Sequence, residues 1–229
     1  MCRSASSGRL ALNLGSVVRK VTTTEEASPA TTRQRLLDSA SALFSAASFN
    51  GVSIRDIERH AGVERGLLSY HFGGKQTLWL NVVDSIYDPF LRELSNLASM
   101  LRDVPTRERA RALRKAYVRF NAHHPEFFRL LVLEGLERTE RTEHLEGKLR
   151  AGTELYAAML GSHEPESIND VMLRHLLIAA SAAPFVLPAF REPVLEALGM
   201  GDDPAATPEF LEPYADLVAD LGLDALSRH

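Results

Sequence analysis

The sequence contains a single cysteine, Cys2, among its 229 residues. One thiol cannot form a disulfide framework or a zinc–thiolate site within one chain, and such sparse use is typical of a reducing cytosol. Long apolar runs are lacking too, because the longest, residues 176–190, is shorter than the roughly 20 residues that span a bilayer and contains Ser181 and two prolines. Residues 10–18 are too interrupted to read as an export signal, and no cleavage site follows them. We therefore expect a cytoplasmic protein without a membrane-spanning helix.

Motifs of known catalytic chemistry are also missing. The chain has neither a Gly-x-Ser-x-Gly elbow nor a His-Glu-x-x-His pair. The Gly73-Gly74-Lys75 segment lacks the glycine spacing and the following Ser or Thr of a nucleotide-binding loop. The adjacent pair His123-His124 does not converge on one metal ion as an i,i+4 pair would, so a capping or exposed role fits better. We predict no catalytic residue, no metal site and no cofactor.

Charge is divided unevenly along a chain whose formal net charge is −4. Residues 1–30 and residues 31–80 each carry two more basic than acidic side chains, whereas residues 81–229 carry 16 basic and 24 acidic ones. An acidic body is thus attached to a weakly basic head. This polarity would orient the chain on a polyanion such as DNA.

Apolar periodicity beyond residue 30 is helical, and no alternating strand pattern stands out. Residues 1–29 are rich in Ser, Thr, Ala and Gly and are predicted to be a flexible arm, either a solvated tail or, through its arginines, a DNA contact. A capping box of Thr31 and Gln34 is expected to open the first helix, which ends near Asn50. Further helices are expected over about 54–61, 64–71, 75–94, 105–122, 124–138, 142–161, 166–190 and 208–226. The predicted fold class is all-α.

Residues 53–72 predict two short amphipathic helices joined by a tight Ala61-Gly62-Val63 turn, which is the spacing of a DNA-reading helix-turn-helix. Ser53 is placed as the N-cap of the first of these helices. The apolar side chains of the segment recur at helical spacing, and Arg55, Arg65, Ser69 and Tyr70 are left on the outward face. Outward residues of these types can bond phosphates and bases.

These residues resemble the tetracycline-repressor (TetR) family of bacterial regulators. The similarity covers roughly residues 30–90 and rests on linked positions that include Phe44, Gly51, Ala61-Gly62-Val63, His71-Phe72 and the Lys75-x-x-Leu78 pair. It implies an N-terminal three-helix DNA-binding domain over residues 30–90, with the helix-turn-helix at 53–72. It further implies a helical effector-binding and dimerisation domain over residues 91–229.

The resemblance implies a set of side chains that approach DNA: Ser53, Arg55, Arg65, Gly66, Ser69, Tyr70, His71 and Lys75. Arg65 is the best candidate for a bidentate contact to guanine, and Lys75 in the first turn of the fourth helix suits a phosphate. Gly66 is expected inside the third helix, where it lets backbone approach the groove. Ser69 departs from the tyrosine usual in the family. Glu64 either caps the third helix, the favoured interpretation, or accepts a bond from cytosine.

For the C-terminal half of the chain, the resemblance lies only in the arrangement of the expected helices. In this family the last two long helices pair with a second subunit, and the small residues 179–183 would allow close approach there, or equally packing within one subunit. Candidate residues for an apolar effector pocket are Tyr117, Phe120, Phe127, Phe128, Leu131, Tyr156, Met159, Met172 and Phe185, with Glu134, Arg174 and His175 as polar anchors. Any of these residues could instead be plain core.

Together these features predict a sequence-specific transcriptional regulator, most often a repressor in this family. The expected partners are a palindromic double-stranded DNA operator, a second copy of the chain and a small-molecule effector. Two other classes stay open. One is an effector-independent DNA-organising protein, which a cavity-free core would indicate, and the weaker one is an all-helical enzyme or lipid-binding module.

Overall fold

The computed structural model describes residues 29–160, 168–187 and 208–221, and over these ranges the chain is all-helical with no strand. The predicted fold class is confirmed. Residues 1–28 of the predicted arm and residues 161, 166–167, 188–190 and 222–226 of the expected helices lie outside the described residues. The helices are α1 (Pro29–Ala47), α2 (Ile54–Ala61), α3 (Leu67–Phe72), α4 (Lys75–Met100), α5 (Thr106–His123), α6 (Pro125–Glu134), α7 (Glu140–Leu160), α8 (Ile168–Val186) and α10 (Pro208–Asp220).

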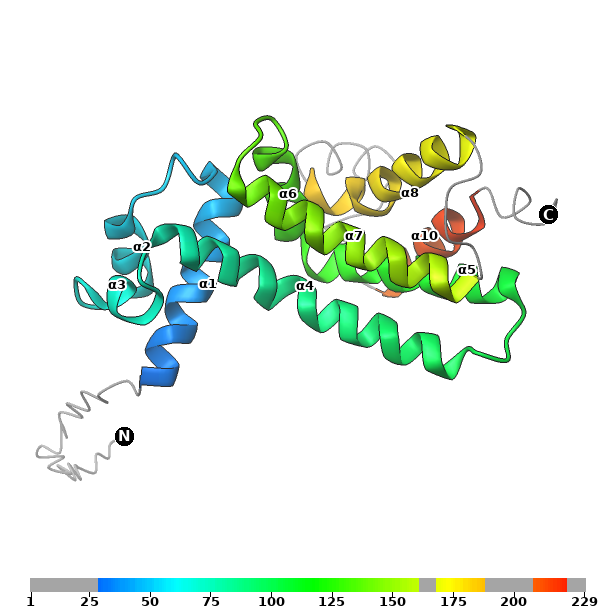
Figure 1. Cartoon of the computed structure of the whole chain (residues 1–229), viewed down its shortest axis with the longest axis horizontal. Coiled ribbons are helices and arrows are strands. Elements are labelled where there is room, and N and C mark those ends of the chain that lie inside the picture. The colour runs from blue at the N-terminus through cyan, green and yellow to red at the C-terminus, as the bar shows by residue number, and fades with distance from the viewer. Residues whose placement is uncertain (1–28, 161–167, 188–207, 222–229) are drawn as a thin grey trace, which may run out of the picture.

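A small head at one end of the molecule consists of α1, α2, α3 and the start of α4 (Figure 1). The apolar stripe predicted for the helix-turn-helix is buried at Ile57, Ala61, Leu68 and Phe72. These side chains pack on α1 and α4, where Phe44 is fully buried. Burial of a large apolar side chain stabilises by about 1.5–3 kcal/mol, so this cluster accounts for how three short helices hold together.

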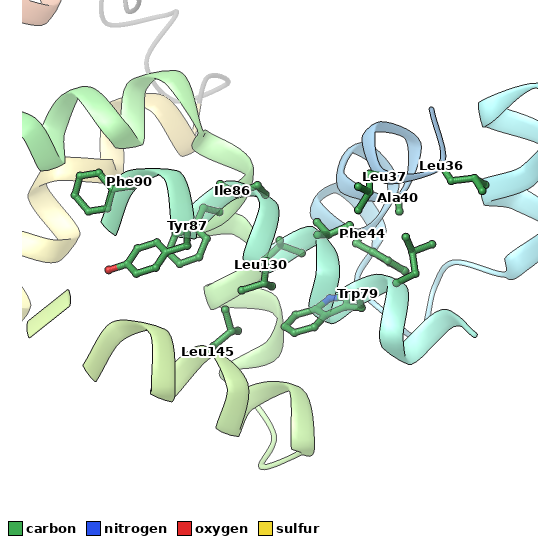
Figure 2. Packing of buried hydrophobic residues seen from close by; sticks show 14 of the residues in the cluster. Leu36, Leu37, Ala40, Phe44, Trp79, Ile86, Tyr87, Phe90, Leu130 and Leu145 are labelled. Carbon is green, nitrogen blue, oxygen red and sulfur yellow. The ribbon is translucent and has the colours of Figure 1, made fainter. Parts of the chain in front are cut away.

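Helix α4 runs from the head into the body without a break, as Figure 1 shows. Its buried side chains join the two regions into one apolar core: Trp79 lies beside Phe44 of the head, whereas Tyr87 and Phe90 lie toward the body (Figure 2). Helix α1 also packs against α6, and α4 against α7. The head is therefore not tethered by a flexible linker but shares a core with the body.

The body consists of the rest of α4 together with α5, α6, α7, α8 and α10, and α10 packs along α5. A second apolar cluster lies between α5, α8 and α10. Ion pairs flank it: Arg111 bonds Asp216 and Asp220 at 2.6 and 2.7 Å, and Arg119 bonds Glu212 at 2.7 Å. None of the described helices combines the length and the hydropathy that crossing a bilayer requires.

Several predicted helix boundaries were wrong, and α4 extends to Met100 instead of ending near residue 94. Helix α1 begins at Pro29, so Thr31 lies inside it and is not an N-cap; proline suits the first turn because its fixed φ is already helical. Helix α3 begins at Leu67 and not at residue 64, for the reason given below. Helix α6 ends at Glu134 with Gly135 as its C-cap, and Thr139 and Thr142, whose hydroxyls accept from each other's backbone amides, cap the start of α7.

Candidate functional site

Reciprocal hydrogen bonds fix the start of α2. The Ser53 hydroxyl accepts from the Asp56 amide at 3.2 Å, and the Asp56 carboxylate accepts from the Ser53 amide at 3.1 Å. The predicted N-cap is thereby confirmed as a capping box. At the other end Gly62 is left-handed with φ 61°, a conformation that glycine adopts without strain. Arg35 of α1 donates to the Gly62 carbonyl at 2.9 Å, which ties the turn to the head.

A buried carboxylate sets the start of α3, the second helix of the helix-turn-helix. Glu58 Oε1 accepts from the amides of Gly66 and Leu68 at 2.8 and 3.2 Å, and its side chain is almost fully buried. Gly66 is therefore the N-cap and not a helix-interior residue, and its φ of 90° suits glycine. The expected capping role of Glu64 was also wrong, because Glu58 bonds these amides and the Glu64 side chain is exposed.

The predicted DNA-binding side chains lie on the solvent side of α2, α3 and the turn between them. Arg55, Arg65, Ser69 and Tyr70 are exposed, and Tyr70 reaches 80% exposure, which is unusual for so large a ring. His71 is half-buried, with its ring edge-on to Tyr70 at 5.0 Å. Within the described part of the chain, the guanidiniums of Arg55 and Arg65 have no hydrogen-bond or ion-pair partner. Both charges are thus available to an external anion.

Lys75 is the first residue of α4, as predicted, but its side chain is folded back. Its ammonium lies 4.1 Å from the centre of the Phe49 ring. Burial, and then the nearby charge of Arg141, lower the pKa of Lys75 below its usual value. The first turn of α4 contains no acidic residue and no side-chain cap. A phosphate at this turn would meet open amides and would draw the ammonium outward.

Arg141 of α7 joins the body to this edge of the head. Its guanidinium lies 3.8 Å from the centre of the Phe49 ring and donates to Gln76 Oε1 at 3.2 Å. It also bonds the carboxylate of Glu134 at 2.8 Å, and both side chains are largely buried. Glu134, predicted as a pocket anchor, is instead the ion-pair partner of Arg141.

The body contains a cavity of about 140 Å³ between α4, α5, α7, α8 and α10. Its walls are mainly apolar, with three tyrosines, one arginine and two small hydroxyl side chains. Its lining residues are Tyr87, Phe90, Leu94, Leu113, Arg114, Tyr117, Leu149, Gly152, Thr153, Tyr156, Leu177, Ile178, Ser181 and Val218. Burial raises the pKa of Tyr117 to about 12 and raises that of Tyr87 as well, so both phenols are neutral at neutral pH.

Of the predicted pocket residues whose side chains the structure describes, Tyr117 and Tyr156 line this cavity and the others lie elsewhere. Those buried in the apolar core outside the lining are Phe120, Phe127, Met159 and Phe185. Phe128 and Leu131 on α6 are half-buried, and Met172 and His175 on α8 are exposed. The side chain of Arg174 lies outside the described residues.

The profile of the bacterial regulatory proteins of the tetR family matches residues 36–82, which contain the helix-turn-helix described above. The helix-turn-helix segment of this chain is of the TetR type. The repressor NicS of Pseudomonas putida is 32% identical over 109 residues, which cover 47% of this chain and 50% of NicS. YttP of Bacillus subtilis, named a probable HTH-type regulator, is 28% identical over 103 residues, 45% of this chain and 50% of YttP. The chain thus spans about half the length of these relatives.

Structural similarity to TetR-like proteins extends beyond the matched segment. A TetR-like transcriptional regulator from Rhodococcus sp. RHA1 superposes with a TM-score of 0.61 at 19% identity. The superposition covers 87% of this chain and 98% of that protein. The body therefore has the fold of TetR-like bodies, although little of its sequence is shared.

Two features of this chain escaped sequence reasoning. The cap by Glu58 depends on a contact between residues eight and ten apart, which no local pattern marks. A partial signal existed for the cavity, because Tyr87, Phe90 and Leu94 recur at helical spacing on α4. Their neighbours across the cavity are nineteen or more residues distant in the sequence, so spacing alone did not bring them together.

Proposed function

We propose that the chain is a sequence-specific, ligand-responsive transcriptional repressor that acts in the bacterial cytoplasm as a homodimer on a palindromic operator. The observation that carries this proposal is the exposed face of α3, with partner-free arginines beside it, inside the TetR-family match. An N-cap glycine and a buried carboxylate hold this face in place. A helix held in this way enters the major groove without first having to order itself.

A second copy of the chain is the expected occupant of an apolar stripe on α8 and α10. Met172 and Leu176 of α8 and Leu187, which directly follows its end, are at least half exposed, as is Leu217 of α10. The small residues Ala179 and Ala183 lie on the same exposed side of α8, which allows close helix approach. A two-fold operator needs two reading heads, and this stripe supports a dimer that supplies them.

The cavity favours a ligand-responsive regulator over an effector-independent DNA-organising protein. A ligand shifts an equilibrium only through a difference in affinity between two states. Cavity residues Tyr87, Phe90 and Leu94 lie on α4, whose first residue is Lys75 in the DNA-facing turn. A ligand that changes the position of α4 therefore changes the DNA face, and ligand and operator oppose each other's binding.

Fluorescence anisotropy with the DNA upstream of the gene for this protein tests the proposal, with an unrelated duplex as competitor and a salt titration. We expect nanomolar, selective binding that weakens steeply with salt. Equal, weak binding to both duplexes would contradict sequence-specific regulation. The variant Leu176→Glu provides a second test, because light scattering should show a loss of dimer and operator affinity should fall with it. A wild-type protein that is monomeric in solution would contradict the proposed homodimer.

A further inference from the structure

The cavity contains a buried positive charge without a carboxylate to balance it. Arg114 is only 7% exposed, and no described residue forms an ion pair with it. Its Nε donates to the Tyr156 hydroxyl at 3.2 Å, and its Nη1 donates to the carbonyls of Ala219 and Leu221 at 3.0 and 2.7 Å. These acceptors satisfy donors of the guanidinium, but they carry no net charge that would balance it. A buried cation is costly unless an anion accompanies it.

The polar groups around Arg114 add hydrogen-bond donors. The Tyr117 hydroxyl is buried and forms no hydrogen bond of normal geometry in the described structure, although the side chain of Asn121 lies close to it and lowers its pKa slightly against the effect of burial. The Tyr156 hydroxyl accepts from Arg114, so its own proton is left to donate. No carboxylate or imidazole lines the cavity. The lining therefore complements an acceptor, and a negatively charged one best.

The remaining walls fix the size and character of the ligand. Phe90, Leu113, Leu149 and Ile178 are among the apolar side chains that surround about 140 Å³. A dry apolar cavity of about 150 Å³ accommodates benzene. Helix α7 approaches the wall of the cavity closely at Gly152, where a Cβ would lie 2.5 Å from the Tyr87 hydroxyl, so a larger side chain here would intrude on the space. The space thus fits one six-membered ring or a short alkyl chain.

We propose that the cavity binds a small monocarboxylate whose apolar body lies against the leucine and phenylalanine walls and whose carboxylate faces Arg114 and Tyr117. This assignment rests on the proposed function of the cavity as the effector site. A charged carboxylate satisfies both groups at once: it balances the guanidinium and accepts from the buried phenol. A cationic ligand of the same shape would meet Arg114 without a counter-charge.

Isothermal titration calorimetry of the full chain tests the proposal with probes of matched shape and different charge. The probes are benzoate and hexanoate as carboxylates, benzamide as a neutral analogue and benzylamine as a cation. We expect benzoate or hexanoate to bind at least tenfold more tightly than benzamide, and benzylamine not to bind. Tyr117→Phe keeps the ring and removes the hydroxyl, and it should weaken carboxylate binding about fivefold. Gly152→Val should abolish binding of every probe.

Tyr70→Phe, the same change on the exposed face of α3, is the matched control and should leave all probe affinities unchanged. Equal binding of benzoate and benzylamine, no binding of either carboxylate, or full affinity in Tyr117→Phe would each overturn the proposal. Tyr117→Phe avoids the contacts that Arg114 makes with the end of α10, so it separates ligand recognition from folding. Anisotropy without any probe tests the regulator function separately. Carboxylate binding that leaves operator affinity unchanged would support the ligand class and refute the effector role.

Discussion

The helix-turn-helix head carries its candidate binding groups on its outer surface, whereas the helical body carries its candidate binding groups inside. In the head, Arg55 and Arg65 point into solvent, and the buried carboxylate of Glu58 only holds the recognition helix. In the body, Arg114 and Tyr117 are inside, and the exposed ion pairs only hold α10 against α5. Under the proposed function, the head meets a large rigid partner at its surface and the body holds a small one inside. The two regions meet at α4 and at Arg141.

The largest effect is expected from breaking that junction with Arg141→Met. The change leaves the Glu134 carboxylate buried without its cation and removes the contact with Phe49. Unfolding free energy should fall by about 3 kcal/mol or more, because a lone buried charge is strongly destabilising. Urea unfolding followed by the fluorescence of Trp79, the single tryptophan, measures this. Arg138→Met removes an exposed ion pair in the preceding loop and should cost less than about 1 kcal/mol. Equal losses of unfolding free energy in the two variants would contradict the role of Arg141 in joining the head to the body.

The next effect is confined to the head. Glu58→Ala leaves the amides of Gly66 and Leu68 without their acceptor, which costs about 1–3 kcal/mol of local stability. Hydrogen exchange at these two amides should accelerate about tenfold or more while amides of α7 stay protected, and operator affinity should fall. Glu93→Ala, an exposed change on α4, is the control. Unchanged exchange at Gly66 and Leu68 would show that α3 does not depend on this cap.

The helix-turn-helix was predictable because its determinants are local. Ser53, the Gly62 turn and the apolar stripe all lie within one twenty-residue segment, and each has a fixed spacing. The start of α3 was misplaced because it depends on Glu58, a contact across the turn that propensity does not encode. The cavity was mostly missed because five helices supply its lining. Tyr117 and Tyr156 were selected as large aromatic residues on expected helices, but Phe120 and Phe127, chosen by the same reasoning, fill the core behind Tyr87.

Two cationic side chains of the head should contribute differently to operator binding, one to sequence preference and the other to affinity for any DNA. Arg65→Ala should remove preference at one base pair, where the wild type discriminates by about 1–3 kcal/mol. Lys75→Ala should weaken binding to all sequences a few-fold and lower the salt slope by about one. Anisotropy with a panel of single-base-pair operator variants distinguishes the two. An Arg65→Ala protein with the wild-type order of preference would refute its base contact.

The smallest effect concerns the ion pairs of the body. The hydrogen bond from Arg119 lowers the pKa of Glu212 to about 2, and the bonds from Lys115 and Arg111 lower the pKa values of Asp216 and Asp220. Lowered folded-state pKa values give stability that is present above about pH 4.5 and lost as the pH falls toward 2. Glu212→Gln should lower the melting temperature by about 1–3 °C at pH 7, and the difference should vanish near pH 2. A difference in melting temperature that persists at pH 2 would show that the charge of Glu212 is not its cause.

The part of α4 from Lys75 to Tyr87 precedes Pro89, the proline inside this helix, and acts as a rigid arm with its two ends in different environments. About 18 Å of helix separates Tyr87 at the cavity from Lys75 at the DNA face, at about 1.5 Å per residue. A tilt of about 5° at the cavity end moves the far end by about 1.6 Å, more than a hydrogen bond to a phosphate tolerates. In the proposed dimer the two arms tilt in opposite directions. The distance between the two heads therefore changes by twice the displacement of one head, whereas the operator half-sites stay about 34 Å apart.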